Sequence, residues 1–212
     1  MPPSSSAARG TAYREWPSLE APGPFPRLLP WLLLIGGAIG LLAASVLTVE
    51  KIAILRDPTY VPSCSINPVL SCGSVMTKPQ AEAFGFPNPL LGIAGFAIVA
   101  SIGAALLAGA AFRRWFWLGL QAGATFGVVF VHWLIFQSLY RIGALCPYCM
   151  AVWTVTIAIF WYVTLHNLNR YLPAPPTLSL ITRYHGVVLT AWTVLLLALI
   201  GEQFWSYWRT LP

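Results

Sequence analysis

Four cysteines are the residues of this chain best suited to chemistry, and they form two pairs. Cys146 and Cys149 belong to a Cys-Pro-Tyr-Cys tetrad, and Cys64 and Cys72 enclose seven residues, with the turn-forming Asn67-Pro68 between them. A thiolate attacks a disulfide through a mixed-disulfide intermediate, so two pairs that meet can pass electrons from one to the other. The four residues therefore suggest a thiol–disulfide relay.

The tetrad heads a long apolar run, and its local structure favours one reactive thiol. Pro147 is typical of the first position of a helix, which puts Cys146 at the N-cap. The start of a helix and a C-x-x-C arrangement both lower the pKa of a cysteine. Cys149 lies one turn further on the same helix face. We expect Cys146 to meet a partner from the water side and Cys149 to face an apolar interior.

The spacing alone leaves two other uses of the cysteines open. Two structural disulfides would use the same residues, although a bridge within one helical C-x-x-C crosslinks almost nothing. A zinc site built from four thiolates usually has two short C-x₂₋₄-C knuckles, whereas one spacing here has seven intervening residues. Neighbouring thiols outside the cytoplasm tend to oxidise, so the relay is favoured and no metal site is predicted.

The elements that position the cysteines are predicted to be transmembrane helices. Of the 212 residues, 58% are hydrophobic and only 8% are charged, whereas soluble domains have about 25% charged residues. A helix needs about 20 apolar residues to cross the bilayer. We predict an all-α integral membrane protein whose five spans lie near Leu28–Val49, Leu90–Ala111, Trp115–Tyr140, Pro147–Leu168 and Val187–Trp208.

Both cysteine pairs follow an odd number of predicted spans, so they lie on the same face of the membrane. If the N-terminus is cytoplasmic, that side holds seven Lys and Arg residues against five on the other side. The short Arg113-Arg114 turn weighs most in such a comparison. We predict a multi-pass protein of the plasma or inner membrane, with the cysteines and the C-terminus extracytoplasmic. The basic residues are too scattered for a nucleic-acid-binding face.

Residues 1–27 are rich in proline, serine and alanine and are predicted to form a disordered cytoplasmic tail. Residues 28–212 are predicted to form one membrane domain, with an extracytoplasmic cysteine loop at 50–89. Five glycines are expected to allow close helix packing: Gly36, Gly37, Gly40, Gly92 and Gly95. His132, inside the third span, is a functional candidate, but a bond to a main-chain carbonyl is the favoured interpretation.

The cysteine pattern, together with "FGFPNPLLG" at 84–92, resembles the vitamin K epoxide reductase family over roughly residues 28–208, and in particular its five-span bacterial members. The resemblance implies a four-helix transmembrane bundle around a quinone, with a fifth, peripheral span. It also implies an enzyme that reoxidises a secreted DsbA-like or thioredoxin-like protein and so supports disulfide bond formation. The fused thioredoxin-like domain of many members is absent, so a separate partner protein is expected.

The resemblance also implies roles for the four cysteines. Cys64 and Cys72 match the family's shuttle pair. Cys146 matches the catalytic cysteine that exchanges with the shuttle, and Cys149 matches the one that reacts with the quinone. The acceptor would be menaquinone or ubiquinone.

Two further residues match quinone contacts of the family. Asn88 matches an asparagine that bonds a quinone carbonyl, and Trp153 falls where vertebrate members have a tyrosine with the same role. From the residues alone, Asn88 before Pro89 is also typical of a helix N-cap, so both roles stay open.

Two rival functions remain at this point. A DsbB-type oxidase performs the same chemistry on a four-span fold, which the fifth predicted span argues against. A non-enzymatic membrane scaffold with structural disulfides would need the same four cysteines.

Overall fold

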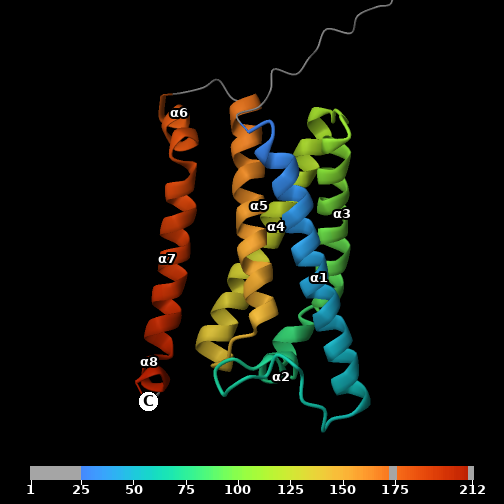
Figure 1. Ribbon diagram of the computed structural model, residues 1–212, viewed down its shortest axis with the longest axis vertical. Coiled ribbons are helices and arrows are strands. Elements are labelled where there is room, and N and C mark those ends of the chain that lie inside the picture. Colours follow the sequence, from blue (N-terminus) through green and yellow to red (C-terminus); the bar gives the residue numbers. More distant parts are fainter. Residues whose placement is uncertain (1–24, 172–175, 210–212) are drawn as a thin grey trace, which may run out of the picture.

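The computed structural model describes residues 25–171 and 176–209, and this part of the chain contains helices but no strand (Figure 1). Five helical segments are long and apolar enough to cross a membrane, which confirms the predicted all-α membrane fold. They are α1 (Leu28–Arg56), α3 (Pro89–Leu107), α4 (Arg114–Phe136) with its π-helical continuation η2 (Gln137–Ile142), α5 (Pro147–Tyr171) and α7 (His185–Gln203). Most of the predicted tail at 1–27 lies outside the described residues.

Short helices connect the spans. The loop between α1 and α3 contains α2 (Cys72–Met76) and the 3₁₀ helix η1 (Pro79–Glu82). Helix α6 (Pro176–Arg183) precedes α7, and α8 (Trp205–Trp208) follows it as a separate turn. The predicted fifth span near Val187–Trp208 therefore ends earlier than expected, at Gln203.

The end of the first span differs most from its prediction. Helix α1 continues past Val49 to Arg56, so the charged residues Glu50 and Lys51 lie inside it. Both side chains are buried, because each bonds to the loop that follows rather than to water. The predicted span at Leu28–Val49 is therefore shorter than the helix, and the charged pair directly after it belongs to the folded helix.

The spans form a bundle with one open side. Helix α1 packs against α3 and α5, and α4 packs against α5, but α3 and α4 make little contact with each other. Helix α7 stands at the edge of the bundle, and none of its described residues is buried (Figure 1). Its first residue is nevertheless attached, because the His185 carbonyl accepts a hydrogen bond from Trp161 Nε1 at 3.1 Å. The structure therefore has the four-helix bundle and peripheral fifth span that were expected.

Glycines let α1 and α3 approach closely. A Cβ added to Gly37 would lie 2.6 Å from the main-chain nitrogen of Ala100, and one added to Gly40 would overlap the Phe96 ring. Close packing through these glycines is therefore confirmed. For Gly95 the prediction is wrong, since nothing lies within 4 Å of an added Cβ.

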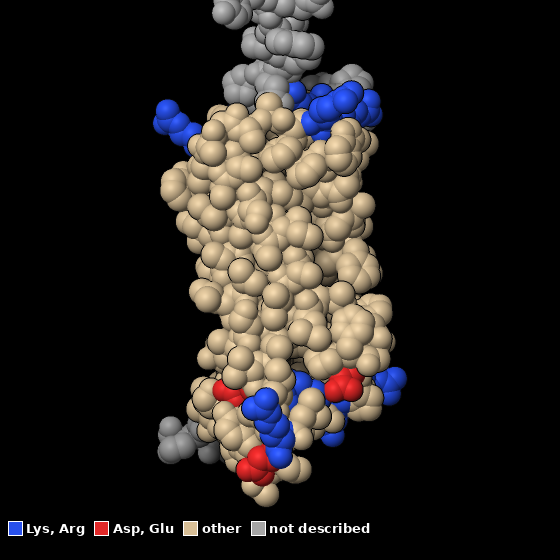
Figure 2. All heavy atoms as spheres, turned by 90° about the vertical axis from the view of Figure 1, so that its right-hand side faces the viewer, with Lys and Arg blue, Asp and Glu red and all other residues tan. Residues whose placement is uncertain are grey.

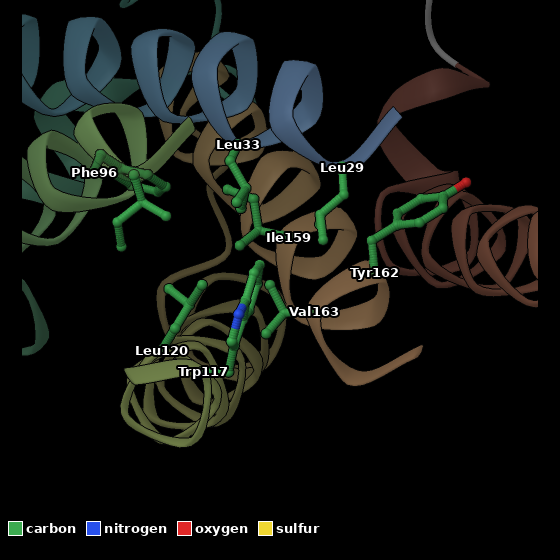
Figure 3. Packing of buried hydrophobic residues seen from close by; sticks show 9 residues of the cluster. Leu29, Leu33, Phe96, Trp117, Leu120, Ile159, Tyr162 and Val163 are labelled. Carbon is green, nitrogen blue, oxygen red and sulfur yellow. The ribbon is translucent and has the colours of Figure 1, made fainter. Parts of the chain in front are cut away.

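A core of apolar side chains joins four helices, α1, α3, α4 and α5, near the end of the bundle where α1 begins (Figure 3). Leu33 of α1 and Val163 of α5 are completely buried there, and Trp117 of α4 packs against the same cluster. Between lipid-facing helices such contacts stabilise mainly by van der Waals packing. This core fixes α4 and α5 relative to α1 and leaves the space between α3 and α4 unfilled.

Charged residues gather at the two ends of the molecule and leave a band without charges between them (Figure 2). The end near the start of α1 shows Lys and Arg only, whereas the opposite end shows both signs (Figure 2). The cysteine loop belongs to the opposite end, where α2 crosses below the bundle (Figure 1).

Candidate functional site

A short parallel bridge brings the two cysteine pairs together. Leu70 of the loop pairs with Leu145, which precedes α5. The Leu145 N–H donates to the Val69 carbonyl at 2.7 Å, and the Ser71 N–H donates to the Leu145 carbonyl at 2.8 Å. Cys146 directly follows Leu145, and Cys72 lies two residues after Leu70. The bridge therefore sets Cys72 beside Cys146.

The turn that leads into this bridge follows from the predicted Asn67-Pro68 pair. Asn67 Oδ1 accepts hydrogen bonds from the main-chain N–H groups of Val69 and Leu70, at 3.0 and 2.7 Å. The asparagine side chain thereby bends the segment back, which allows its two flanking cysteines to meet.

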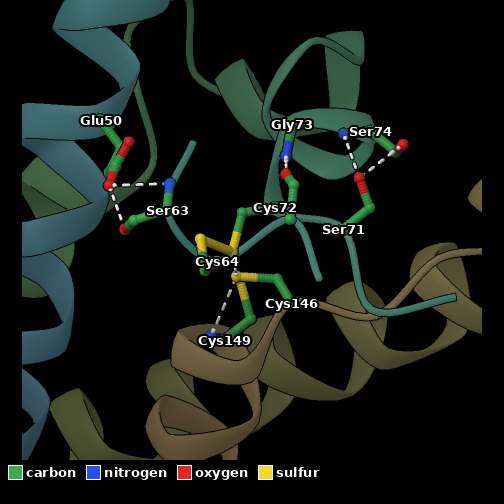
Figure 4. Close-up of a disulfide and its surroundings, with 10 residues drawn as sticks. Glu50, Ser63, Cys64, Ser71, Cys72, Gly73, Ser74, Cys146 and Cys149 are labelled. Atoms are coloured by element: carbon green, nitrogen blue, oxygen red, sulfur yellow. Dashed lines mark hydrogen bonds between the residues drawn. A yellow bond between two sulfur atoms is a disulfide. The ribbon is translucent and has the colours of Figure 1, made fainter. Parts of the chain in front are cut away.

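The sulfur atoms form a compact group (Figure 4). Cys64 and Cys72 form a disulfide, while Cys146 and Cys149 are free thiols. Cys72 Sγ lies 3.1 Å from Cys146 Sγ, and the sulfurs of Cys64, Cys72 and Cys146 all lie within 4.8 Å of one another. This arrangement suits thiol–disulfide exchange, in which a thiolate attacks a neighbouring sulfur. In this redox state two of the three sulfurs are bonded to each other and are not thiolate ligands.

Cys146 occupies the helix start that the sequence predicted. Helix α5 begins at Pro147, and the Cys149 N–H donates to Cys146 Sγ at 3.4 Å. A hydrogen bond from the Cys149 thiol, helped by the main-chain N–H groups of Cys149 and Tyr148, lowers the pKa of Cys146, although burial opposes this effect. The thiolate of Cys146, which is the form that attacks disulfides, is therefore favoured.

The expectation that Cys146 faces water is wrong. Cys146 and Cys72 are both 0% exposed, and Cys64 is 6% exposed. The cysteine loop covers the start of α5, so the loop disulfide lies between Cys146 and the aqueous side. A soluble protein would have to engage the loop before electrons could reach α5.

Two charged residues that the sequence analysis did not single out hold the loop in place. Glu50 Oε1 accepts hydrogen bonds from Ser63, at 2.6 Å from its hydroxyl and 3.4 Å from its main-chain N–H (Figure 4). Ser63 directly precedes Cys64, so α1 fixes the first cysteine of the loop. These two bonds offset part of the cost of burying the carboxylate, whose other oxygen is buried without a hydrogen-bond partner among the described residues.

Lys51 performs the same task for the second arm of the loop. Its ammonium group donates to the Met76 carbonyl at 2.7 Å and pairs with Glu82 Oε1 at 2.9 Å. Met76 ends the helix that Cys72 begins. The signal for both anchors was present in the sequence, since two charges directly follow the charge-free run of the first span.

An apolar cavity of about 680 Å³ lies inside the bundle, next to the cysteine loop. Side chains of α1, α3, α4 and α5 line it, and the loop segments around Met76 and Gln80 line the end nearest the cysteines. Cys149 and Trp153 both contribute to its wall. Binding sites for small molecules commonly have this size and this mostly apolar character.

Small residues line the cavity where α3 and α4 separate. Gly95 of α3 and Gly119 and Gly123 of α4 belong to its wall, and an added Cβ at any of them would meet nothing within 4 Å. These glycines therefore provide room rather than helix packing. A flat or flexible apolar molecule could lie between the two helices.

Asn88 lies at the start of α3, but it does not cap the helix. Its side chain makes no capping bond. Instead Oδ1 accepts from the Ala83 N–H at 3.0 Å, and Nδ2 donates to the Gln80 carbonyl at 2.7 Å. The interpretation of Asn88 as an N-cap side chain is wrong, because its amide closes the turn that precedes the helix. Asn88 also lines the cavity.

Trp153 is buried among apolar side chains of α4 and its continuation, including Val131, Ile135 and Leu139. Trp153 lies about one helical turn beyond Cys149 on α5, and both residues line the cavity. His132 makes the main-chain contact that was favoured, between its Nδ1 and the Val128 carbonyl at 2.5 Å.

The comparison with protein families agrees with this arrangement. Residues 31–164, more than half of the chain, match the model of the vitamin K epoxide reductase family. The matched range contains the four cysteines, Asn88 and Trp153, and it ends within α5. No curated protein matches the chain.

Proposed function

The chain belongs to the vitamin K epoxide reductase family, and we propose that it carries electrons from a secreted DsbA-like or thioredoxin-like protein to a membrane quinone. Membership implies a membrane oxidoreductase that acts on thiols and quinones, and it replaces the DsbB-type alternative. The observation that carries the proposal is the 3.1 Å contact between Cys72 and Cys146, with Cys149 next in line on the wall of an apolar cavity.

The relay follows from the order of the sulfurs. A thiolate of the partner attacks Cys64, and a second partner thiol completes the partner's disulfide and leaves Cys64 and Cys72 reduced. Cys72 then attacks Cys146 of an oxidised 146–149 pair, and Cys149 leaves as a thiol. Attack of Cys64 on Cys72 restores the loop disulfide and releases Cys146. The result is a loop disulfide with two free thiols on α5, which are the bonds of this structure.

The cavity suits a quinone as the final acceptor. When bound, a quinone accepts the two electrons and two protons of the Cys146–Cys149 dithiol, whose disulfide then reforms. The apolar wall fits a lipid-soluble molecule, and the unfilled space between α3 and α4 offers room for an apolar tail. Menaquinone and ubiquinone share these properties, so both are candidate acceptors.

Two residues of the wall are assigned to the ring end of the site. Asn88 Nδ2 has a second hydrogen beyond the one that it donates to Gln80, and this hydrogen is available to a ring oxygen. Trp153 supplies a rigid aromatic surface beside Cys149. Because Asn88 also closes the preceding turn, its loss would disturb the geometry of the site as well as a contact.

The charge distribution supports the orientation that the relay needs. Of the described residues, those at the end near the start of α1 include Arg27, Arg113 and Arg114 and no Asp or Glu. The described acidic residues lie towards the cysteine end: Glu50, Asp57, Glu82 and Glu202. An excess of Lys and Arg marks the cytoplasmic side. We therefore assign the cysteine loop to the extracytoplasmic side, where a secreted partner is found.

The proposal is tested with the full chain purified in detergent, a reduced DsbA-like protein as donor, and menaquinone or ubiquinone analogues as acceptors. We expect quinone reduction that depends on the donor. Cys149→Ala should abolish it while Cys72 and Cys146 can still pair, and Cys64→Ala should impair turnover with the protein donor. Cys64→Ala with full activity towards that donor would contradict the shuttle.

A scaffold with structural disulfides would behave differently in the same preparation. The enzyme should form a mixed disulfide between Cys64 and the donor when the exchange is stopped early, and a donor that lacks its second thiol should stabilise it, because that thiol completes the exchange. A scaffold gives no such complex and reduces no quinone.

A further inference from the structure

One polar atom at the loop end of the cavity has no partner. Gln80 lies in η1, and its Oε1 is buried without a hydrogen-bond partner among the described residues. Of the six buried side-chain atoms in this condition in the described part, this atom alone belongs to a residue that lines the cavity. Gln80 was not among the residues that the sequence analysis selected.

The surrounding turn holds Gln80 firmly in this place. The main-chain carbonyl of Gln80 accepts the hydrogen bond from Asn88 Nδ2 at 2.7 Å, and Asn88 Oδ1 accepts from the main-chain N–H of Ala83 at 3.0 Å. The main-chain N–H of Asn88 donates to the Ala81 carbonyl at 2.9 Å. Asn88 is thus bonded to three residues of the segment that presents Gln80 to the cavity. A side chain on such a braced turn is poorly able to move away and find another partner.

A buried polar atom without a partner lowers the stability of a protein, and such atoms in native structures call for an explanation. A hydrogen-bond donor of a bound molecule in the cavity, such as the hydroxyl of a reduced quinone, would supply the missing bond to this oxygen. The rest of the wall is mostly apolar, so the polar part of that molecule would lie at this end, where Gln80, Asn88 and Lys51 gather.

We propose that Gln80 hydrogen-bonds a ring oxygen of the bound quinone. The inference rests on the proposed function. A carboxamide offers a carbonyl oxygen and an NH₂ group on one planar end, so rotation by half a turn exchanges an acceptor for a donor. Gln80 can therefore donate to the carbonyl of a quinone and accept from the hydroxyl of the reduced product. Asn88 acts as the positioning residue of this contact.

The test measures binding and stability rather than turnover. Gln80→Met keeps the length of the side chain but removes the amide, and Gln80→Leu is a second apolar variant. Gln203→Met is the matched control, because Gln203 is exposed at the end of α7 and does not line the cavity. The oxidised full chain in detergent is titrated with menadione and with a short-chain ubiquinone, without any thiol donor, and the melting temperature is recorded without and with quinone.

We expect Gln80→Met to bind menadione about 3- to 10-fold more weakly than the unchanged protein, the factor that one neutral hydrogen bond contributes. Without quinone its melting temperature should be unchanged or higher, because the variant no longer buries an unpaired oxygen. A residue that only supports the fold would show the reverse, a lower melting temperature with unchanged affinity. Gln203→Met should match the unchanged protein in both measurements.

Three other results would contradict the role of Gln80. Equal affinity of Gln80→Met and the unchanged protein for both quinones overturns the role of Gln80 and leaves the proposed function standing. Loss of the folded state in both the Met and the Leu variant also overturns it, because an unpaired oxygen is not needed for folding. If the unchanged protein binds neither quinone, the proposed function falls first and the role of Gln80 falls with it.

Discussion

The contact between Cys72 and Cys146 can be tested by removing the two cysteines that compete with it. In the double variant Cys64→Ser/Cys149→Ser, the remaining sulfurs lie 3.1 Å apart and have no other cysteine to pair with. We expect them to form a disulfide in mild oxidant, within one chain and in high yield. The matched control Cys64→Ser/Cys146→Ser keeps Cys72 and Cys149, and Cys149 is not one of the three clustered sulfurs.

The size of the effect follows from the length of chain that each bridge closes. The native disulfide joins residues separated by 8 positions, which corresponds to about 2.6 kcal/mol of stabilisation in the chain-entropy account. A bridge between Cys72 and Cys146 spans 74 positions, which corresponds to about 4.5 kcal/mol. The second figure is an upper limit, because residual structure in the unfolded chain reduces the entropy that a crosslink removes.

The assay has two parts. Digestion with trypsin under non-reducing conditions, followed by mass spectrometry, identifies a crosslink between a peptide that contains Cys72 and one that contains Cys146. Thermal unfolding in detergent, with and without reductant, then measures the stabilisation. A double variant that stays reduced, or that crosslinks only between molecules, would refute the relay geometry. Equal crosslinking of the control would show that the cysteine loop does not select Cys146.

Three further outcomes are expected. Gly37→Ala should lower the free energy of unfolding by about 1–3 kcal/mol, because its Cβ would meet the Ala100 nitrogen at 2.6 Å; Gly95→Ala, which meets nothing within 4 Å, is the control in the same thermal unfolding experiment. Lys51→Met should lower the free energy of unfolding by about 1–3 kcal/mol, because it leaves the Met76 carbonyl unpaired. The lost ion pair with Glu82 adds little, because that carboxylate is 40% exposed. The same variant should slow the Cys72–Cys146 crosslinking. The lowered pKa of Cys146 depends first on the Cys149 thiol, so Cys149→Ala should raise the pH at which ultraviolet absorbance reports the Cys146 thiolate, and an unchanged titration would contradict this cause.

The membrane fold was largely predictable from the sequence, since the absence of charge over long runs leaves few alternatives to spanning helices. The contact between Cys72 and Cys146 was predictable only in outline, because the sequence places both cysteine pairs on one membrane face but does not show that they meet. Its geometry depends on the bridge between Leu70 and Leu145, which joins segments with no local sequence signal for each other. The burial of Cys146 was missed for the same reason, because the loop that covers it is distant in the chain.

Asn88 and Gln80 show where local patterns mislead. An Asn-Pro pair at the start of a helix is typical of a cap, yet the amide of Asn88 bonds backward to Ala83 and Gln80. The helical dihedral angles of Asn88, φ −52° and ψ −34°, differ from the extended conformation that a capping side chain usually needs. Gln80 has no motif at all, and its interest comes only from a cavity formed by distant helices.

The covered position of Cys146 favours one direction for the proposed relay. Among the three clustered cysteines only Cys64 is exposed at all, at 6%, whereas Cys72 and Cys146 are both completely buried, so a thiol of a soluble partner would reach Cys64 first. Glu50 and Lys51 hold both arms of that cover to α1. Reduction of the loop disulfide removes the crosslink between the two arms but leaves each arm attached to α1. In the proposed relay, Cys72 would then form its bond to Cys146 while both arms stay on α1, so electrons would enter through the loop.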